Sequence, residues 1–143
     1  MSQTILIVDD STLIRHALRS YLEHEREWQV CGEAENGQVA VEQVKKLRPD
    51  VVILDLQMPV MNGLDAARQI ISVAPNTAMV MFTLYKSEQL WKDAKAAGIR
   101  DVLSKSDEGP DHLLASLQNI LSSSTVFDLN DLSRCHEEAE GAD

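Results

Sequence analysis

Basic residues are scarce in this sequence. Thirteen Lys and Arg stand against 23 Asp and Glu in 143 residues, which gives a formal net charge of −10. A surface that binds nucleic acid without sequence preference needs clustered Lys and Arg to neutralise phosphates. The deficit therefore argues against such a surface.

Cysteine is almost missing too. Cys31 and Cys135 are far apart, and neither belongs to the CxxC spacing of metal or redox sites. We assign no chemical role to either. Cys31 lies in an apolar run and is expected to be a small buried hydrophobe, and Cys135 a free thiol.

Long apolar segments are also lacking. No uncharged apolar run approaches the roughly 20 residues that span a bilayer, and no basic region followed by an apolar segment marks a signal peptide. We therefore expect a cytoplasmic protein with no membrane contact. A chain of 143 residues suits one domain that buries its apolar surface without disulfide bonds.

The most informative stretch is 51–63, which reads VVILDLQMPVMNG. Its four leading apolar residues predict a strand buried on both faces. Pro59 and the turn signal Asn62-Gly63 end that strand soon after Asp55. Open α/β sheets place ligands at the carboxyl ends of their strands, so Asp55 is a candidate site residue. Taken alone, it also fits a residue that merely starts a turn.

Strand and helix patterns alternate along the chain. Strand-like apolar runs occupy 4–8, 28–34, 51–54, 77–83 and 99–104. Apolar residues at helical spacing follow each run, at 13–22, 40–47, 64–74, 90–97 and 113–121. This alternation predicts an α/β, flavodoxin-like, doubly wound (βα)5 fold with a parallel five-stranded sheet in the order 2-1-3-4-5.

That strand order brings polar strand ends together at one edge of the sheet. Asp9 and Asp10 follow the first strand, Asp55 the third, Thr83 the fourth and Lys105 the fifth. Each has an ordinary explanation alone, as a helix cap, a strand former or a solvated lysine. Together, three carboxylates need a cation, and oxygen ligands suit Mg²⁺. A lysine and a hydroxyl can hold phosphoryl oxygens, and a carboxylate can be the nucleophile of aspartyl-phosphate chemistry.

Four pieces of this pattern carry a resemblance to a known family. LIVDDS at 6–11, ILDLQMPVMNG at 53–63, Thr83 and Lys105 resemble the receiver domain of bacterial two-component response regulators. The resemblance covers about residues 4–122. VCGEAENG at 30–37, with serine rather than proline after the lysine, is most similar to the NarL-like subfamily.

The resemblance implies a phosphoacceptor and a magnesium site. Asp55 is similar to the aspartate that accepts a phosphoryl group from a sensor histidine kinase or a phosphotransfer protein. Asp9 and Asp10 match the acidic pair that holds Mg²⁺ beside Asp55. The backbone carbonyl of Gln57 is the usual third protein ligand.

The same resemblance implies a switch. Thr83 matches the hydroxyl that moves toward the phosphoryl group, and Lys105 matches the phosphate-binding lysine. Phosphorylation would change the surface of helix 4, strand 5 and helix 5, which would bind a downstream protein or a second copy as a homodimer. Only self-catalysed phosphorylation and dephosphorylation of the aspartate is implied, so the chain is not expected to be an enzyme for other substrates.

Two positions depart from the family pattern. Val102 stands where a Tyr or Phe commonly turns inward, and Leu84 stands where a small residue is common and would narrow access to Asp55. A pseudo-receiver that is never phosphorylated is therefore the alternative. A flavin-binding protein is disfavoured because 9–13 contains no glycine for a phosphate loop. A phosphatase with an aspartate nucleophile is disfavoured because Gln57 stands where a second acid is usual.

The C-terminal segment differs from the rest of the chain. Six acidic residues against Arg134 give 123–143 a charge of −5. We predict a receiver domain at 1–122 and an acidic, flexible tail at 123–143. A short amphipathic piece that docks through Val126, Phe127, Leu129 and Leu132 is the other interpretation. NarL-like receivers precede a DNA-binding domain that regulates transcription, so the chain is either a stand-alone receiver or part of such a regulator. This segment has no basic recognition helix, so we expect no direct DNA binding.

Overall fold

The computed structural model describes residues 3–106 and 109–134, with side chains described as far as residue 122. The strands are β1 (Gln3–Val8), β2 (Trp28–Ala34), β3 (Val51–Leu54), β4 (Ala78–Thr83) and β5 (Asp101–Ser104). The helices are α1 (Thr12–Leu22), α2 (Gly37–Leu47), α3 (Gly63–Val73), α4 (Glu88–Ala96) and α5 (Gly109–Arg134). All strand pairs are parallel, and the order is β2-β1-β3-β4-β5, which confirms the predicted fold.

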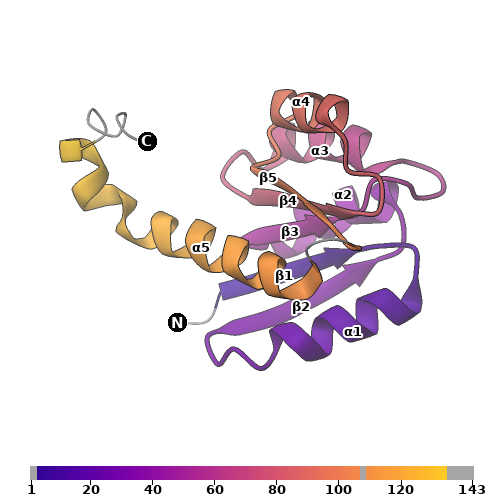
Figure 1. Ribbon diagram of the computed structural model, residues 1–143, viewed down its shortest axis with the longest axis horizontal. Coiled ribbons are helices and arrows are strands. Elements are labelled where there is room, and N and C mark those ends of the chain that lie inside the picture. The colour runs from indigo at the N-terminus through magenta and orange to yellow at the C-terminus, as the bar shows by residue number, and fades with distance from the viewer. Residues whose placement is uncertain (1–2, 107–108, 135–143) are drawn as a thin grey trace.

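The sheet divides the core into two layers (Figure 1). Along β1, Ile5 and Ile7 pack on the side of α1 and α5, whereas Leu6 and Val8 pack on the side of α2, α3 and α4. Because both faces are covered, successive residues of a central strand are all buried, as the whole of β3 is. Polar residues of the central strands β1, β3 and β4 are therefore confined to their ends or to the residues that follow.

Side-chain caps start the helices that leave this sheet. The Ser11 hydroxyl accepts a hydrogen bond from the backbone N–H of Ile14 at 3.2 Å, which selects Ser11 rather than Asp10 as the cap of α1. Ser87 caps α4 in the same way, with its hydroxyl accepting from the backbone N–H of Leu90 at 3.0 Å. At the other end of α4, Gly98 has the positive φ of +94° expected for the residue after a helix C-cap.

The register of the sheet aligns the points where the chain leaves each strand. Val8 pairs with Leu54, and the N–H of Asp55 donates to the Val8 carbonyl at 3.0 Å. On the other side, the N–H of Lys105 donates to the Thr83 carbonyl at 2.9 Å. Residues far apart in sequence are thus held at the same level by backbone hydrogen bonds.

Helix α5 is longer than its apolar pattern predicts. Leu113, Leu117 and Leu121 are buried against the sheet, and the helix then continues past the edge of the sheet to Arg134 (Figure 1). Residues 135–143, including Cys135, lie outside the described part of the chain. The division at residue 122 stays a prediction, although the backbone beyond it begins as helix.

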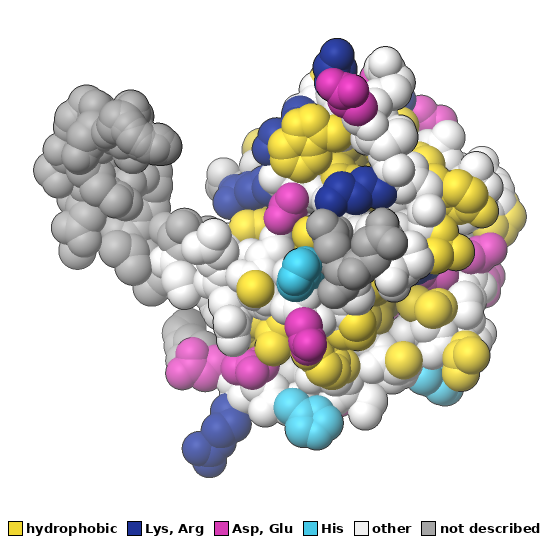
Figure 2. Space-filling view, viewed as in Figure 1, with side chains coloured by type: hydrophobic (Ala, Val, Ile, Leu, Met, Phe, Trp, Pro, Cys, Tyr) yellow, Lys and Arg dark blue, Asp and Glu magenta, His cyan; other side chains and the backbone are white. Residues whose placement is uncertain are grey.

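On the face shown in Figure 2, hydrophobic side chains are interrupted by charged ones. Among the described residues, no helix combines the length and the apolar composition needed to cross a membrane. Cys31 lies on the edge strand β2 and is only half-buried, so it is less enclosed than predicted. Burial still raises the pKa of its thiol, which keeps the thiol in its less reactive protonated form.

Candidate functional site

Three carboxylates meet at the carboxyl ends of β1 and β3. One side-chain oxygen from each of Asp9, Asp10 and Asp55 lies within 4.8 Å of the others. Asp9 is 3% exposed and Asp55 is 7% exposed, whereas Asp10 is open to solvent. The predicted convergence of these residues is confirmed.

Lys105 supplies the opposite charge. Its ammonium Nζ lies 2.6 Å from Asp9 Oδ2 and 3.2 Å from Asp55 Oδ2. Burial alone would lower the pKa of Lys105, but the hydrogen bond to Asp9 and the attraction of both carboxylates raise it above its usual value. The lysine is therefore a fixed cation between two acids.

Hydrogen bonds fix both the backbone and the carboxylate of Asp9. Its N–H donates to the Ala34 carbonyl at 3.0 Å, and its Oδ1 accepts from the N–H of Ser11 at 2.9 Å. Its own carbonyl accepts from the Arg15 guanidinium at 2.6 Å. Sequence reasoning missed Arg15, whose only signal is a basic residue one helical turn into α1.

The backbone around Asp55 is tightly packed. Asp55 Oδ1 accepts from the N–H of Leu56 at 2.8 Å, and the N–H of Gly63 donates to the Leu56 carbonyl at 2.8 Å. A Cβ at position 63 would lie 2.1 Å from the Asp55 carbonyl oxygen, so only glycine fits. The glycine that predicts a turn from sequence therefore also lets the loop pack against the backbone of Asp55.

Burial raises the pKa of the Asp55 carboxyl above its ordinary value. Lys105 opposes this effect by stabilising the charged form, and the neighbouring Asp9 charge adds to it. The loss of water around the Asp55 carboxylate and the nearby negative charge of Asp9 both raise the free energy of its ionised form. A cation placed beside it would relieve both costs.

A hollow of about 520 Å³ opens above these groups. Its lining includes Gln57, Leu84 and Tyr85 around the acidic cluster. Leu84 is 59% exposed, so this side chain stands at the rim, where we expected it to narrow access to Asp55. Gln57 reaches the hollow, while the metal-binding role of its carbonyl stays a prediction.

Thr83 and Val102 lie deeper. The Thr83 hydroxyl is fully buried at the end of β4 and accepts from the N–H of Tyr85 at 3.1 Å. Val102 is 1% exposed and packs in the core layer that contains α4. The predicted movement of the Thr83 hydroxyl toward a phosphoryl group also stays a prediction.

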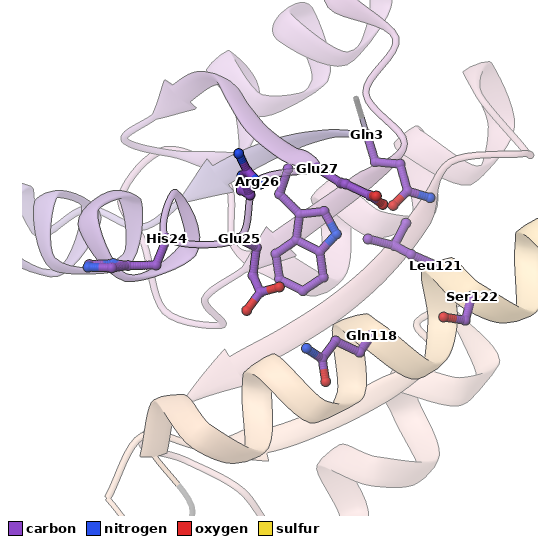
Figure 3. A pocket seen from close by; sticks show the side chains of 9 residues that line it. Gln3, His24, Glu25, Arg26, Glu27, Gln118, Leu121 and Ser122 are labelled. Atoms are coloured by element: carbon purple, nitrogen blue, oxygen red, sulfur yellow. The ribbon is translucent and has the colours of Figure 1, made fainter. Parts of the chain in front are cut away.

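Another hollow, of about 390 Å³, lies at the amino ends of β1 and β2. Gln118 and Leu121 of α5 lie across it from Glu25 in the loop before β2 (Figure 3). This hollow therefore lies at the opposite edge of the sheet from the acidic cluster. Parallel α/β sheets bind ligands at the carboxyl ends of their strands, so it is not the candidate site.

The acidic cluster suits a hard divalent cation. Three carboxylates and one ammonium leave two negative charges uncompensated, which a single divalent ion balances. All the candidate ligand atoms are oxygens, and Mg²⁺ prefers such ligands while keeping several waters. Asp9, Asp10 and Asp55 are the residues that would hold it.

A parallel sheet of this order, with an acidic cluster and a lysine at its carboxyl edge, defines a receiver-type signalling domain. A family model described as the response regulator receiver domain matches residues 5–118. The chain belongs to this family, the receiver domains of two-component response regulators.

Individual relatives agree with this assignment. The chain is 36% identical to the chemotaxis protein CheY of Thermotoga maritima over 105 residues, which cover 73% of this chain and 87% of CheY. It is 34% identical to the transcriptional regulatory protein LnrK of Bacillus subtilis over 123 residues, 86% of this chain. The receiver domain of the response regulator NarL from Mycobacterium tuberculosis superposes with a TM-score of 0.75 at 26% identity, covering 82% of this chain and 94% of that one.

The length of these relatives varies. The chain covers 56% of LnrK and 28% of a protein-glutamate methylesterase of Photobacterium profundum, to which it is 41% identical over 110 residues, 76% of this chain. The receiver domain is therefore the part these proteins share.

Proposed function

We propose that Asp55 accepts a phosphoryl group in a Mg²⁺-dependent reaction. The observation that supports this most strongly is the placement of its buried carboxylate beside Lys105 and within reach of the Asp9 and Asp10 oxygens. Phosphoryl transfer depends mainly on positioning and charge neutralisation, which these groups provide. The donor is a phosphohistidine on a sensor histidine kinase or a phosphotransfer protein.

In the proposed step, an Asp55 side-chain oxygen attacks the phosphorus of the phosphohistidine. The new O–P bond forms as the P–N bond breaks, and the imidazole leaves with the electron pair and takes a proton from solvent. The Lys105 ammonium donates to a phosphoryl oxygen, and the Thr83 hydroxyl donates to another. Water later attacks the phosphorus as the O–P bond to Asp55 breaks, which releases inorganic phosphate and restores the carboxylate, and we propose no other catalysis.

Asp9, Asp10 and Asp55 would hold Mg²⁺, with the Gln57 carbonyl as the further protein ligand. When bound, Mg²⁺ neutralises charge between the carboxylates and the phosphoryl oxygens. Asp9 is pre-positioned for this role by the hydrogen bonds to its backbone and its carboxylate.

The test is incubation of the full chain with acetyl phosphate and Mg²⁺, read by intact mass. We expect one added phosphoryl group on the parent and none on Asp55→Asn. Asp65→Asn is the matched control, because Asp65 is an exposed aspartate on α3 outside the cluster. Omitting Mg²⁺ should abolish labelling of the parent and of Asp65→Asn.

Two outcomes would contradict the proposal. Labelling that persists in Asp55→Asn would remove Asp55 from the reaction. A parent protein that acquires no phosphoryl group from acetyl phosphate or from a phosphohistidine donor would establish the pseudo-receiver alternative instead.

We further propose that phosphorylation acts through the surface of α4, β5 and α5. On α4, Trp91 is 39% exposed and the ammonium of Lys95 lies 4.8 Å from its ring centroid. An exposed aromatic residue beside a cation suits a protein partner, either a downstream protein or a second copy of this chain. Size-exclusion chromatography with and without acetyl phosphate tests the homodimer.

The subfamily and setting are part of the same proposal. We infer a NarL-like domain that serves transcription regulation in the cytoplasm. This is supported by the resemblance of 30–37 and of Lys105-Ser106 to the NarL-like subfamily, and by the similarity of the chain to LnrK and to the NarL receiver. The chain either acts alone or is the receiver part of a DNA-binding regulator, and it does not itself contact DNA. A promoter whose expression responds to the parent chain, or to a regulator that contains it, but not to the Asp55→Asn variant would support this output.

A further inference from the structure

Arg15 connects the acidic turn to the edge strand of the sheet. Its Nη1 donates to the Asp9 carbonyl at 2.6 Å, and its Nε donates to Glu33 Oε1 on β2 at 2.9 Å. A third nitrogen, Nη2, lies 3.3 Å from the Thr12 hydroxyl. The side chain is only 13% exposed, so water competes weakly with these contacts.

The contact to the Asp9 carbonyl fixes a peptide plane that concerns both acids. That carbonyl belongs to the planar peptide linking Asp9 to Asp10, so its direction fixes the plane in which the Asp10 N and Cα lie, from which the side chain starts. Within the described part of the chain, no side-chain hydrogen bond or ion pair is found for the Asp10 carboxylate itself. The orientation of Asp10 is therefore set through the backbone.

Glu33 in turn fixes Arg15. Its second oxygen, Oε2, accepts from Arg19 Nε at 2.8 Å, so each carboxylate oxygen holds one guanidinium. Burial opposes the charge on Glu33, but the hydrogen bonds from Arg19 and Arg15 outweigh it and hold the pKa of Glu33 below its usual value. Glu33 is thus an anion at neutral pH, and both arginines are paired.

We propose that Arg15 is a positioning residue for the magnesium site, acting through the Asp9–Asp10 peptide. The planar guanidinium donates to the carbonyl and to Glu33 at once, which the single ammonium of a lysine cannot reproduce in the same geometry. Residues that orient metal ligands affect affinity by about 10-fold to 100-fold when lost. This inference rests on the proposed function, because it assumes that Asp9 and Asp10 hold Mg²⁺.

The test compares Arg15→Ala, Arg15→Lys and Arg19→Ala in the full chain. Arg19 is the matched control, since it lies one turn further along α1 and pairs with the same Glu33 without contacting Asp9. The Mg²⁺ dissociation constant is measured by calorimetric titration at a temperature where circular dichroism shows every variant folded. We expect Arg15→Ala to weaken binding about 10-fold, Arg15→Lys to recover only part of the loss, and Arg19→Ala to bind like the parent.

A second readout needs no metal. The carbonyl ¹³C resonance of Asp9 reports its hydrogen bonding, and we expect it to shift in both Arg15 variants and to stay in place in Arg19→Ala. If Arg15→Ala does not fold, Arg15→Lys decides with the same two measurements.

The outcomes separate the inference from the function beneath it. A parent that does not bind Mg²⁺ would overturn the magnesium role of the cluster. A parent that binds Mg²⁺, with Arg15 variants that match Arg19→Ala in affinity and in the Asp9 resonance, would overturn the positioning role alone.

Discussion

The Asp55 carboxylate lies in surroundings that do not favour its charge. Burial raises the pKa of this carboxyl, so the folded state binds the proton more readily than the unfolded state does. The ionised side chain therefore costs stability at every pH above its unfolded pKa. If the site receives a cation and a phosphoryl group, as proposed, their binding would offset this cost.

Replacing Asp55 by Asn should therefore stabilise the metal-free protein at pH 7. We expect about 1 kcal/mol, because the substitution keeps the shape and removes a crowded buried charge. The gain should shrink as the pH falls and the parent carboxyl takes up its proton. Urea unfolding in EDTA at pH 7 and pH 4 measures both effects. An Asn variant that is less stable than the parent at pH 7 would contradict this account.

Val60, in the loop after Asp55, has a φ of +69°. This left-handed conformation is strained for a β-branched residue and much less so for asparagine. Because the side chain is 79% exposed, its replacement loses little packing. We expect Val60→Asn to stabilise the protein by about 1 kcal/mol, measured by thermal unfolding.

Leu13→Asn is the comparison for Val60, since Leu13 is also 79% exposed but lies in the regular backbone of α1. It should be neutral or slightly destabilising. Equal effects of the two substitutions would mean that backbone strain at position 60 is not the cause.

Among the elements, the start of α3 constrains the site most tightly. Gly63→Ala places a Cβ against the Asp55 backbone carbonyl, which cannot move without displacing β3, so we expect a loss of about 3 kcal/mol or more. Gly32→Ala meets the ends of two side chains, Leu47 at 2.9 Å and Leu6 at 3.4 Å, which can move aside, and should cost about 1 kcal/mol or less. Urea unfolding of both variants compares them, and similar losses would contradict the steric explanation.

The ion pairs of Glu33 on β2 with Arg15 and Arg19 on α1 should contribute a stability that depends on pH. The pKa of Glu33 is depressed in the folded state, so its two ion pairs stabilise the protein above the unfolded pKa of about 4.5, and this stability is lost as the pH falls through the folded value. Glu33→Gln should cost about 1 kcal/mol at pH 7 and progressively less below pH 4.5. Unfolding measured across this range checks the sign, and a cost that grows at low pH would contradict it.

The helices and strands could be predicted because two sequence signals were strong, the buried apolar run of β3 and the regular alternation of strand and helix patterns. The apolar run of β3 requires two covered faces, and the alternation of strands and helices leaves few topologies for a parallel sheet. Once the strand order was predicted, Asp9, Asp55 and Lys105 had to meet at one edge. The predicted strand order and the polar residues at the strand ends thus determined most of the candidate site.

The rest depended on contacts that leave little trace in sequence. Leu13 fits the apolar spacing of α1 but is exposed, and the neighbouring Ile14 packs against the core instead. Arg15 looks like any surface arginine until β2 places Glu33 beside it. The continuation of α5 beyond Leu121 begins with three serines, which interrupt the apolar spacing of 113–121, so that spacing gave no reason to extend the helix.

At the scale of the whole molecule, the receiver should be separable from the segment after residue 122. Leu121 is the last buried residue of α5 in the part whose side chains are described. A chain of residues 1–122 should accept a phosphoryl group from acetyl phosphate like the full chain, with a thermal midpoint within about 3 °C. Intact mass and thermal unfolding test this, and loss of labelling would show that the last 21 residues support the site.

The acidic cluster and its lysine come from the ends of separate strands that span positions 9–105. During synthesis on the ribosome, the aspartates emerge well before β5 carries the lysine into place. If Asp55 accepts a phosphoryl group with the help of Lys105, as proposed, a nascent chain would become competent for the reaction only after nearly the whole domain has been translated and folded. The arrangement makes competence to receive a signal a property that only finished molecules possess.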